Sequence, residues 1–261
     1  MSSLMPGKQQ HTPNTLRSGL GLLNWATNIF TTSVGSKLLV AITGILLSGF
    51  VIIHLIGNLK LFGGPDKINA YAEFLKELGP LLWAARIALL TVLLIHLTLV
   101  IRLKSRSAWA RPQGYYYTKT IQASQSSRTM LMTGIVIFLF ILFHLAHYTF
   151  GLIEKKEVTD PVTGATVMKN YTELKDAKGR HDVYQMVIHG FTSPVISIFY
   201  LLCQLVLMVH LSHGLQSVFQ TLGLNSPRIQ PTIYWIAHLI AILIVLGNSA
   251  IVVAVLFGYV K

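Results

Sequence analysis

The sequence predicts an all-α integral membrane protein, a bundle of five transmembrane helices with an N-terminal interfacial segment. Hydrophobic residues make up 52% of the 261 residues and charged residues only 11%, a balance that no soluble domain of this length needs to bury its core. Five apolar stretches are each near the ~20 residues that a helix needs to cross the hydrocarbon core. Their approximate ranges are 36–59, 80–101, 129–153, 187–215 and 233–258.

The alternatives to a helical bundle are not favoured. Strands of a transmembrane β-barrel show as alternating segments of ~10 residues, whereas these stretches are long and continuously apolar. Residues 1–35 carry Lys8 and Arg17 before a short, mildly apolar run that contains two asparagines and no small-residue cleavage pattern. An interfacial helix therefore fits better than a signal peptide.

We expect a cytoplasmic or interfacial segment over 1–35 and a transmembrane domain over 36–260.

The charged residues predict the orientation of the chain. All nine acidic residues lie in the first and third loops. The other side carries ten basic residues and no acidic one: Lys8, Arg17, Lys37, Arg102, Lys104, Arg106, Arg111, Lys119, Arg128 and Arg228. Because basic residues in short loops mark the cytoplasmic face, we expect the N-terminus inside and Lys261 outside. Such a face attracts anionic lipid or docks a cytoplasmic protein subunit, whereas nothing resembles a nucleic-acid recognition module.

Histidines are the chemically informative residues of the spans. Ten are present; His54, His96, His144, His147 and His210 lie inside spans, and His189, His213 and His238 lie nearer their ends. Ionisable groups inside a membrane are costly and indicate function, although a hydrogen bond to a neighbouring helix would account for any single one.

The span directions place these histidines at two depths. His54 and His144 fall in the outer half of the membrane, and His96 and His210 fall in the inner half. At ~1.5 Å of rise per residue, the two layers are expected very roughly 15 Å apart.

Two histidines from different helices at one depth can supply the two axial nitrogens of a haem. Two layers therefore predict two haems. Zinc is disfavoured, because no carboxylate or cysteine lies near these histidines within the spans and a four-ligand site would need them at one depth. The single cysteine, Cys203, means that any iron–sulfur cluster belongs to a partner. Small residues in the spans would admit either a macrocycle or a close helix: Gly44, Gly49, Gly134 and Gly214.

Several segments match one known family across nearly the whole chain. They are His54-Leu55-Ile56-Gly57-Asn58, Gly79-Pro80-Leu81-Leu82-Trp83-Ala84-Ala85-Arg86, Ala110-Arg111-Pro112, Arg128-Thr129-Met130 with Thr133-Gly134 and His144, His210-Leu211-Ser212-His213-Gly214-Leu215, and Phe219-Gln220-Thr221-Leu222-Gly223-Leu224. With these segments the sequence resembles the cytochrome b membrane anchor of the succinate:quinone oxidoreductase and fumarate reductase family, in its five-helix dihaem form.

The resemblance implies the haem ligands residue by residue. In that family the fourth-helix ligand is followed four residues later by glycine, which selects His210 over His213. The third-helix ligand stands ten residues after the glycine of a Thr-Gly pair, which selects His144 over His147. The resemblance then implies that His96 and His210 are the iron ligands of the inner haem b, and that His54 and His144 are those of the outer haem b.

The resemblance also implies partners and a cellular role. It implies a flavoprotein subunit that oxidises succinate and an iron–sulfur subunit, both on the cytoplasmic face of a bacterial cytoplasmic membrane. Electrons would pass through the two haems to quinone, either menaquinone or ubiquinone, which links the tricarboxylic acid cycle to the respiratory chain. Succinate oxidation itself would reside in a partner subunit.

The quinone site is less clearly marked. Some family members have a glutamate within the second span, where this sequence has no acidic residue. Candidate contacts to quinone or to haem propionates are Arg86, His147 and His189 near the outer haem, with Glu77 at the membrane edge, and Lys37, Arg128, His213 and His238 near the inner haem.

Three other functions remain compatible with the sequence. One is a dihaem cytochrome b anchor of another respiratory enzyme, such as a nitrate reductase or a hydrogenase. Another is a transporter or channel whose histidines relay protons. The third is a passive anchor with structural histidines.

Overall fold

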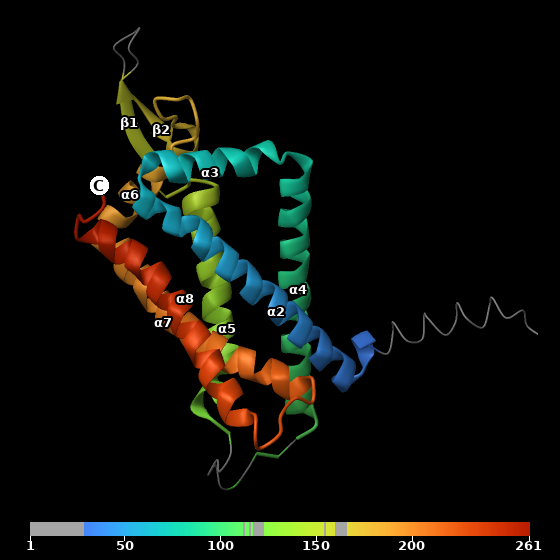
Figure 1. Ribbon diagram of the computed structural model, residues 1–261. Coiled ribbons are helices and arrows are strands. Elements are labelled where there is room, and N and C mark those ends of the chain that lie inside the picture. Colours follow the sequence, from blue (N-terminus) through green and yellow to red (C-terminus); the bar gives the residue numbers. More distant parts are fainter. Residues whose placement is uncertain (1–28, 112, 115, 117–122, 154, 160–165) are drawn as a thin grey trace, which may run out of the picture.

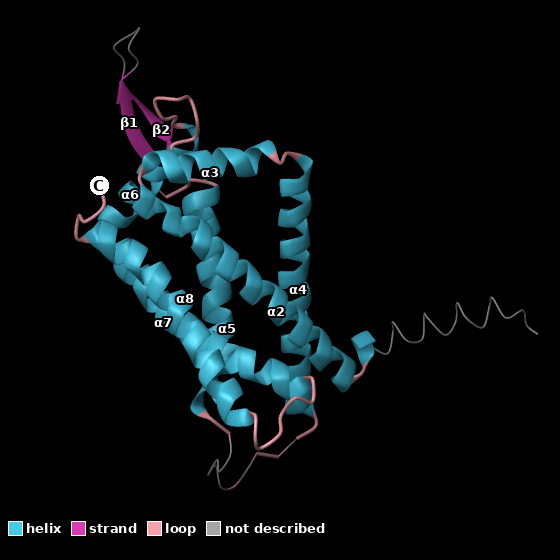
Figure 2. Ribbon diagram, viewed as in Figure 1, coloured by secondary structure: helices cyan, strands magenta, loops and turns pink. Residues whose placement is uncertain are grey.

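The computed structural model describes residues 29–111, 113–114, 116, 123–153, 155–159 and 166–261. Its fold is mostly helical, with one small β-hairpin (Figure 2). The described residues include five helices that are long and apolar enough to cross a membrane, as the sequence predicts. The expected interfacial helix near the N-terminus falls on residues that lie outside the described part of the chain.

The five long helices are α2 (Ser33–Asn58), α4 (Pro80–Trp109), α5 (Gln125–His144), α7 (Pro194–Thr221) and α8 (Gln230–Leu256). Helix α4 packs mainly on α2, and α5 packs mainly on α7, while α7 also packs on α2 and α8 (Figure 1). Small residues make the α7–α8 contact close: Ala237 and Ala241 of α8 are buried, as small residues at helix interfaces in membranes usually are. Many large apolar side chains of α2, α4 and α5 are exposed, which suits surfaces that face lipid.

The fourth apolar stretch differs from the single span expected over 187–215. It contains two helices, α6 (Val183–Thr192) and α7, separated at Ser193. Pro194 occupies the first turn of α7, where its fixed φ and missing N–H are tolerated, whereas within a helix they would break the hydrogen-bond ladder. The apolar composition continues across this break, so hydropathy alone merged the two helices. The long helix of this region is therefore Pro194–Thr221.

The first and third loops form a cap at one end of the bundle (Figure 1). The first loop contains the short helix η1 (Leu59–Gly63) and α3 (Pro65–Glu77), and α3 runs between the ends of α2 and α4. The third loop contains the antiparallel strands β1 (Lys155–Thr159) and β2 (Thr166–Asn170), followed by the single-turn helix η3 (Tyr171–Glu173) and then α6. The two loops that carry the acidic residues thus lie together, as the charge distribution predicts.

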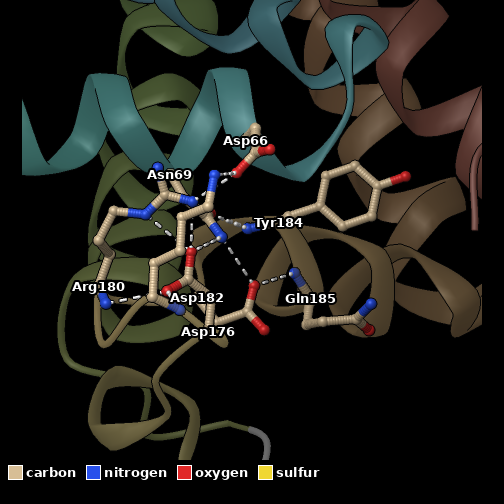
Figure 3. A network of polar contacts seen from close by, with 8 residues as sticks. Asp66, Asn69, Asp176, Arg180, Asp182, Tyr184 and Gln185 are labelled. Atoms are coloured by element: carbon tan, nitrogen blue, oxygen red, sulfur yellow. Dashed lines mark hydrogen bonds and ion pairs between the residues drawn. The ribbon is translucent and has the colours of Figure 1, made fainter.

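A buried asparagine joins the two loops (Figure 3). Asn69 of α3 has no exposed surface. Its Nδ2 donates to Asp176 Oδ2 at 3.3 Å and to Asp182 Oδ1 at 3.2 Å. Its Oδ1 accepts from the backbone N–H of Tyr184 at 2.9 Å. Both N–H groups and the oxygen of the amide are therefore used between α3, the third loop and the start of α6, which fixes their relative positions.

Ion pairs surround this asparagine. Asp66 accepts from Lys178 Nζ at 2.7 Å and from Arg180 Nη2 at 2.8 Å, and Arg180 also pairs with Asp176 at 2.6 Å. We call Asp66, Asn69, Asp176, Arg180 and Asp182 the outer clamp. The Arg180 guanidinium holds the pKa of Asp176 at about 2, below the ordinary 3.8. The hydrogen bonds from Lys178 and Arg180 likewise lower the pKa of Asp66.

The lowered pKa of Asp176 predicts acid-sensitive stability. A carboxyl group whose pKa is lower in the folded state than in the unfolded state stabilises the fold above its unfolded pKa and loses that contribution as the pH falls. We expect the melting temperature of the detergent-solubilised protein to fall as the pH decreases from about 4 to about 2. Asp176→Asn should reduce this fall, whereas Glu77→Gln, at the exposed end of α3, should keep it. Equal acid sensitivity of Asp176→Asn and the unmodified chain would contradict the assignment.

Candidate functional site

The inner pair of histidines is held by two threonines. His96 of α4 has Nδ1 2.9 Å from Oγ1 of Thr43 on α2. His210 of α7 has Nδ1 3.1 Å from Oγ1 of Thr133 on α5. Helices α2 and α7 also pack against each other, so the two threonine–histidine contacts lie on neighbouring helix pairs. Each threonine–histidine hydrogen bond joins two helices that also pack against each other.

A glycine follows each of these threonines and lies against the same imidazole. A Cβ added at Gly44 would lie 3.5 Å from His96 Cε1, and one added at Gly134 would lie 3.4 Å from His210 Cε1. Side chains larger than a methyl group at these positions would occupy space that the rings use. The two Thr-Gly pairs therefore surround the two inner histidines in the same way, with a hydrogen bond at the threonine and space for the ring at the glycine.

The outer pair is formed by His54 of α2 and His144 of α5. Their ring centroids are 5.7 Å apart and their planes are nearly perpendicular, at 87°. Phe50 stacks on His54 at 5.4 Å, and the Nδ1 of His144 is 3.3 Å from the hydroxyl of Tyr200 on α7. Two imidazoles from different helices thus meet at this level too.

The helices set the distance between the two pairs. His54 follows Gly44 by ten residues along α2, and His144 follows Gly134 by ten residues along α5. Ten residues of α-helix rise ~15 Å. Since Gly44 and Gly134 lie beside the inner histidines, the four predicted histidines fall at two levels about 15 Å apart along the helices.

Protein does not enclose the four histidines. His54 is exposed, and the other three are half-buried. Two of the glycines singled out from the sequence, Gly49 of α2 and Gly214 of α7, have nothing within 4 Å of an added Cβ. Part of each imidazole therefore lies on the protein surface.

His147 has a different environment from His144. It lies in the π-helical turn η2 (Leu145–Thr149), which follows α5 directly, and such wide turns are frequent at functional sites. Its side chain is 4% exposed. Its Nδ1 lies 3.0 Å from the hydroxyl of Tyr200, and its ring stacks on Tyr148 at 4.0 Å. The turn thus directs His147 into the protein interior, where it is enclosed, and its role as a quinone or propionate contact stays a prediction.

The other predicted contacts lie nearer the ends of the helices. His189, at the end of α6, stacks on Tyr171 at 4.7 Å, and Arg86 lies 5.1 Å above the ring of Trp83. His238 bonds through Nδ1 to the carbonyl of Tyr234 at 2.8 Å. Three more are placed on the side of the bundle opposite the outer clamp: Lys37 and Arg128, both exposed, and His213, half-buried on α7.

The donor set forms pairs rather than larger groups. In the part of the chain that the structure describes, no three His, Cys, Asp or Glu side chains gather as a multi-ligand metal site would require. A haem iron, by contrast, takes only two axial ligands from the protein.

Sequence reasoning missed Thr43 and Thr133 as functional residues. The available signal was a repeat, because Thr-Gly is followed by a histidine ten residues after the glycine in both the first and the third span. Only the second occurrence was used, through the family resemblance, so the partners of the inner histidines were not identified.

No protein-family profile, curated protein sequence or solved structure matches the chain.

Close packing beside His147 predicts a sensitive position. A methyl group at Gly190 of α6 would lie 2.5 Å from the hydroxyl of Tyr148 and 3.0 Å from Nε2 of His147. Overpacking of this kind costs ~1–3 kcal/mol, so Gly190→Ala should lower the melting temperature measured in detergent. Gln185→Ala, on the exposed face of the same helix, serves as the control and should not lower it. A Gly190→Ala variant as stable as the control would show that α6 does not pack this way.

Proposed function

We propose that this chain is the dihaem cytochrome b anchor of a succinate:quinone oxidoreductase, which carries electrons from a partner iron–sulfur subunit to membrane quinone. The chain would lie in a bacterial cytoplasmic membrane with its N-terminus inside and its C-terminus outside. The observation that carries the proposal is that four long apolar helices contribute four histidines at two levels. The two levels are about 15 Å apart along the helices. The choice of succinate and of the partner subunits rests on the family resemblance.

The residues around each pair fit a haem. Each level offers two imidazoles from different helices, which is the axial set of a bis-histidine cytochrome b. Open space beside Gly49 and Gly214 suits a flat macrocycle. When bound, haem b supplies reversible one-electron chemistry, and the chain supplies position and electrostatics.

The path between the two levels distinguishes electron transfer from a proton relay. The nine residues between Gly134 and His144 on α5 are all apolar. On α2 the one hydroxyl between Gly44 and His54 belongs to Ser48, and it donates to its own helix, to the carbonyl of Gly44 at 2.8 Å. A proton relay needs a chain of polar groups or water, whereas electrons can tunnel through apolar protein. These two helices therefore favour the cytochrome over the transporter.

The basic end of the bundle supports docking of a partner. Arg102 and Arg106 of α4 donate to the carbonyls of Phe30 and Thr31, each at 2.6 Å. These bonds fix the end of α4 to the chain before α2. Together with the exposed Lys104 and Arg111 they make this end of the described chain basic, which suits an acidic face of an iron–sulfur subunit, and anionic lipid would be drawn to the same end.

Haem quantification tests the proposal directly. A reduced-minus-oxidised spectrum of the purified complex should show two haems b per chain. Alanine at His54 or His144 should remove one haem, and alanine at His96 or His210 should remove the other. His213→Ala, the matched control on α7, should retain both. A purified chain without haem absorbance, or a His213→Ala variant that behaves like His210→Ala, would overturn the assignment.

Co-purification distinguishes the enzyme classes that share a dihaem anchor. An affinity-tagged chain extracted in mild detergent should bring down a flavoprotein and an iron–sulfur protein, and the complex should reduce a quinone analogue with succinate. Recovery of a nitrate reductase or hydrogenase subunit instead would retain the haem assignment and replace the succinate assignment.

A further inference from the structure

We infer that Thr43 and Thr133 are positioning residues that fix the tautomer and the ring orientation of the two inner histidines. The inference deepens the proposed function and rests on it, because it concerns how His96 and His210 would present a nitrogen to haem iron. It follows from counting the protons available at each hydroxyl.

Thr43 can donate only one proton, and the hydrogen-bond network assigns it to the helix that carries it. Its Oγ1 lies 2.7 Å from the carbonyl of Leu39 and 3.1 Å from that of Val40. Carbonyl oxygens only accept, so the hydroxyl proton points back into α2. At its third contact, 2.9 Å from Nδ1 of His96, Thr43 Oγ1 can then only accept. The hydrogen-bond network therefore assigns the imidazole proton of His96 to Nδ1.

Thr133 repeats this arrangement on α5. Its Oγ1 donates to the carbonyl of Met130 at 3.0 Å, which uses its single proton. Its oxygen then accepts from Nδ1 of His210 at 3.1 Å. Both inner histidines thus carry the proton on Nδ1 for the same reason, although the two bonds join different pairs of helices.

This tautomer leaves Nε2 of each inner histidine unprotonated. A neutral imidazole binds metal through its unprotonated nitrogen, and the partner of the other nitrogen determines which one that is. Donation from Nδ1 to the threonine also makes the imidazole a stronger electron donor to the metal. The threonines would therefore act on haem through the histidines, without touching it.

The neighbouring glycines complete the positioning. A Cβ added at Gly44 or Gly134 would lie 3.5 Å or 3.4 Å from Cε1 of the ring, next to the hydrogen-bonded Nδ1. Glycine therefore leaves room for the ring, and the hydrogen bond at Nδ1 restricts its rotation about the Cβ–Cγ bond. A free imidazole side chain would otherwise lose this rotational freedom only on binding the ligand.

The outer pair is held differently. The hydroxyl of Tyr200 lies near Nδ1 of both His144, at 3.3 Å, and His147, at 3.0 Å. One phenol is thus shared by two imidazoles, and no threonine takes part in either contact. A substitution at the threonines should accordingly affect the inner haem and leave the outer haem unchanged.

The test replaces each threonine by valine, which keeps the β-branched shape and removes the hydroxyl. We expect Thr43→Val and Thr133→Val to weaken inner-haem retention about 10- to 100-fold, the usual effect of losing such an outer partner. Any inner haem that remains should have a higher reduction potential, because a weaker imidazole donor stabilises the ferric state less. Both quantities are measured by redox titration of haem absorbance and by haem content in membranes containing the full chain.

Two controls separate positioning from general damage. Thr43→Ser and Thr133→Ser keep the hydroxyl and should restore both the retention and the potential of the inner haem. Thr129→Val removes a hydroxyl one turn earlier on α5 that bonds only to its own helix, at the carbonyls of Gln125 and Ser126, and should change neither.

The outcomes distinguish this inference from the proposed function. If the unmodified chain holds two haems and the valine variants leave the inner haem unchanged, the threonine role is wrong and the cytochrome assignment stands. If the serine variants lose the inner haem as the valine variants do, the hydroxyl is not what matters and the inference also fails. If the unmodified chain binds no haem, both fail together.

Discussion

Lipid offers no hydrogen-bond partner, so an imidazole placed within a membrane span needs the protein or a ligand to satisfy both of its nitrogens. This constraint accounts for much of the arrangement of the four helices that carry the histidine pairs. The bond between His96 and Thr43 joins α4 to α2, and the bond between His210 and Thr133 joins α7 to α5. Each bond satisfies one nitrogen and connects one helix pair. In the proposed function the remaining nitrogen of each inner imidazole would bind haem iron, which would link the packing of the helices to the proposed chemistry.

The pair α2–α4 and the pair α5–α7 carry the same sequence pattern. The first helix of each pair carries Thr-Gly and a histidine ten residues later, and the second carries the inner histidine. They differ at the outer end, where α2 continues into η1 and α3 while α5 widens into the π-helical turn that turns His147 inward. Helix α8 has no counterpart in this scheme. It covers α7 through buried small residues, and its Gly247 lies close to Leu55 of α2.

The outer clamp connects the first loop to the third loop at the end of the bundle. Helix α4 packs mainly on α2, and α3 is the segment that connects the outer ends of these two helices. The amide of Asn69 and the carboxylates around it tie α3 to the third loop and to α6. Part of that loop thereby organises the ends of the helices while its Lys178 stays exposed.

The sequence alone determined the properties that depend on composition and on spacing within one segment. The five apolar stretches, the separation of acidic from basic loops and the two depths of histidine follow from hydropathy, charge and the rise of an α-helix. Only the tertiary structure decided which faces meet. It showed that α6 and α7 are separate helices that meet at Ser193, which hydropathy could not reveal because the apolar composition does not change there. It also placed His144 beside His54 and enclosed His147. It also joined each inner histidine to a threonine 53 or 77 residues away, a contact that depends on the packing of two helices and that no local pattern contains.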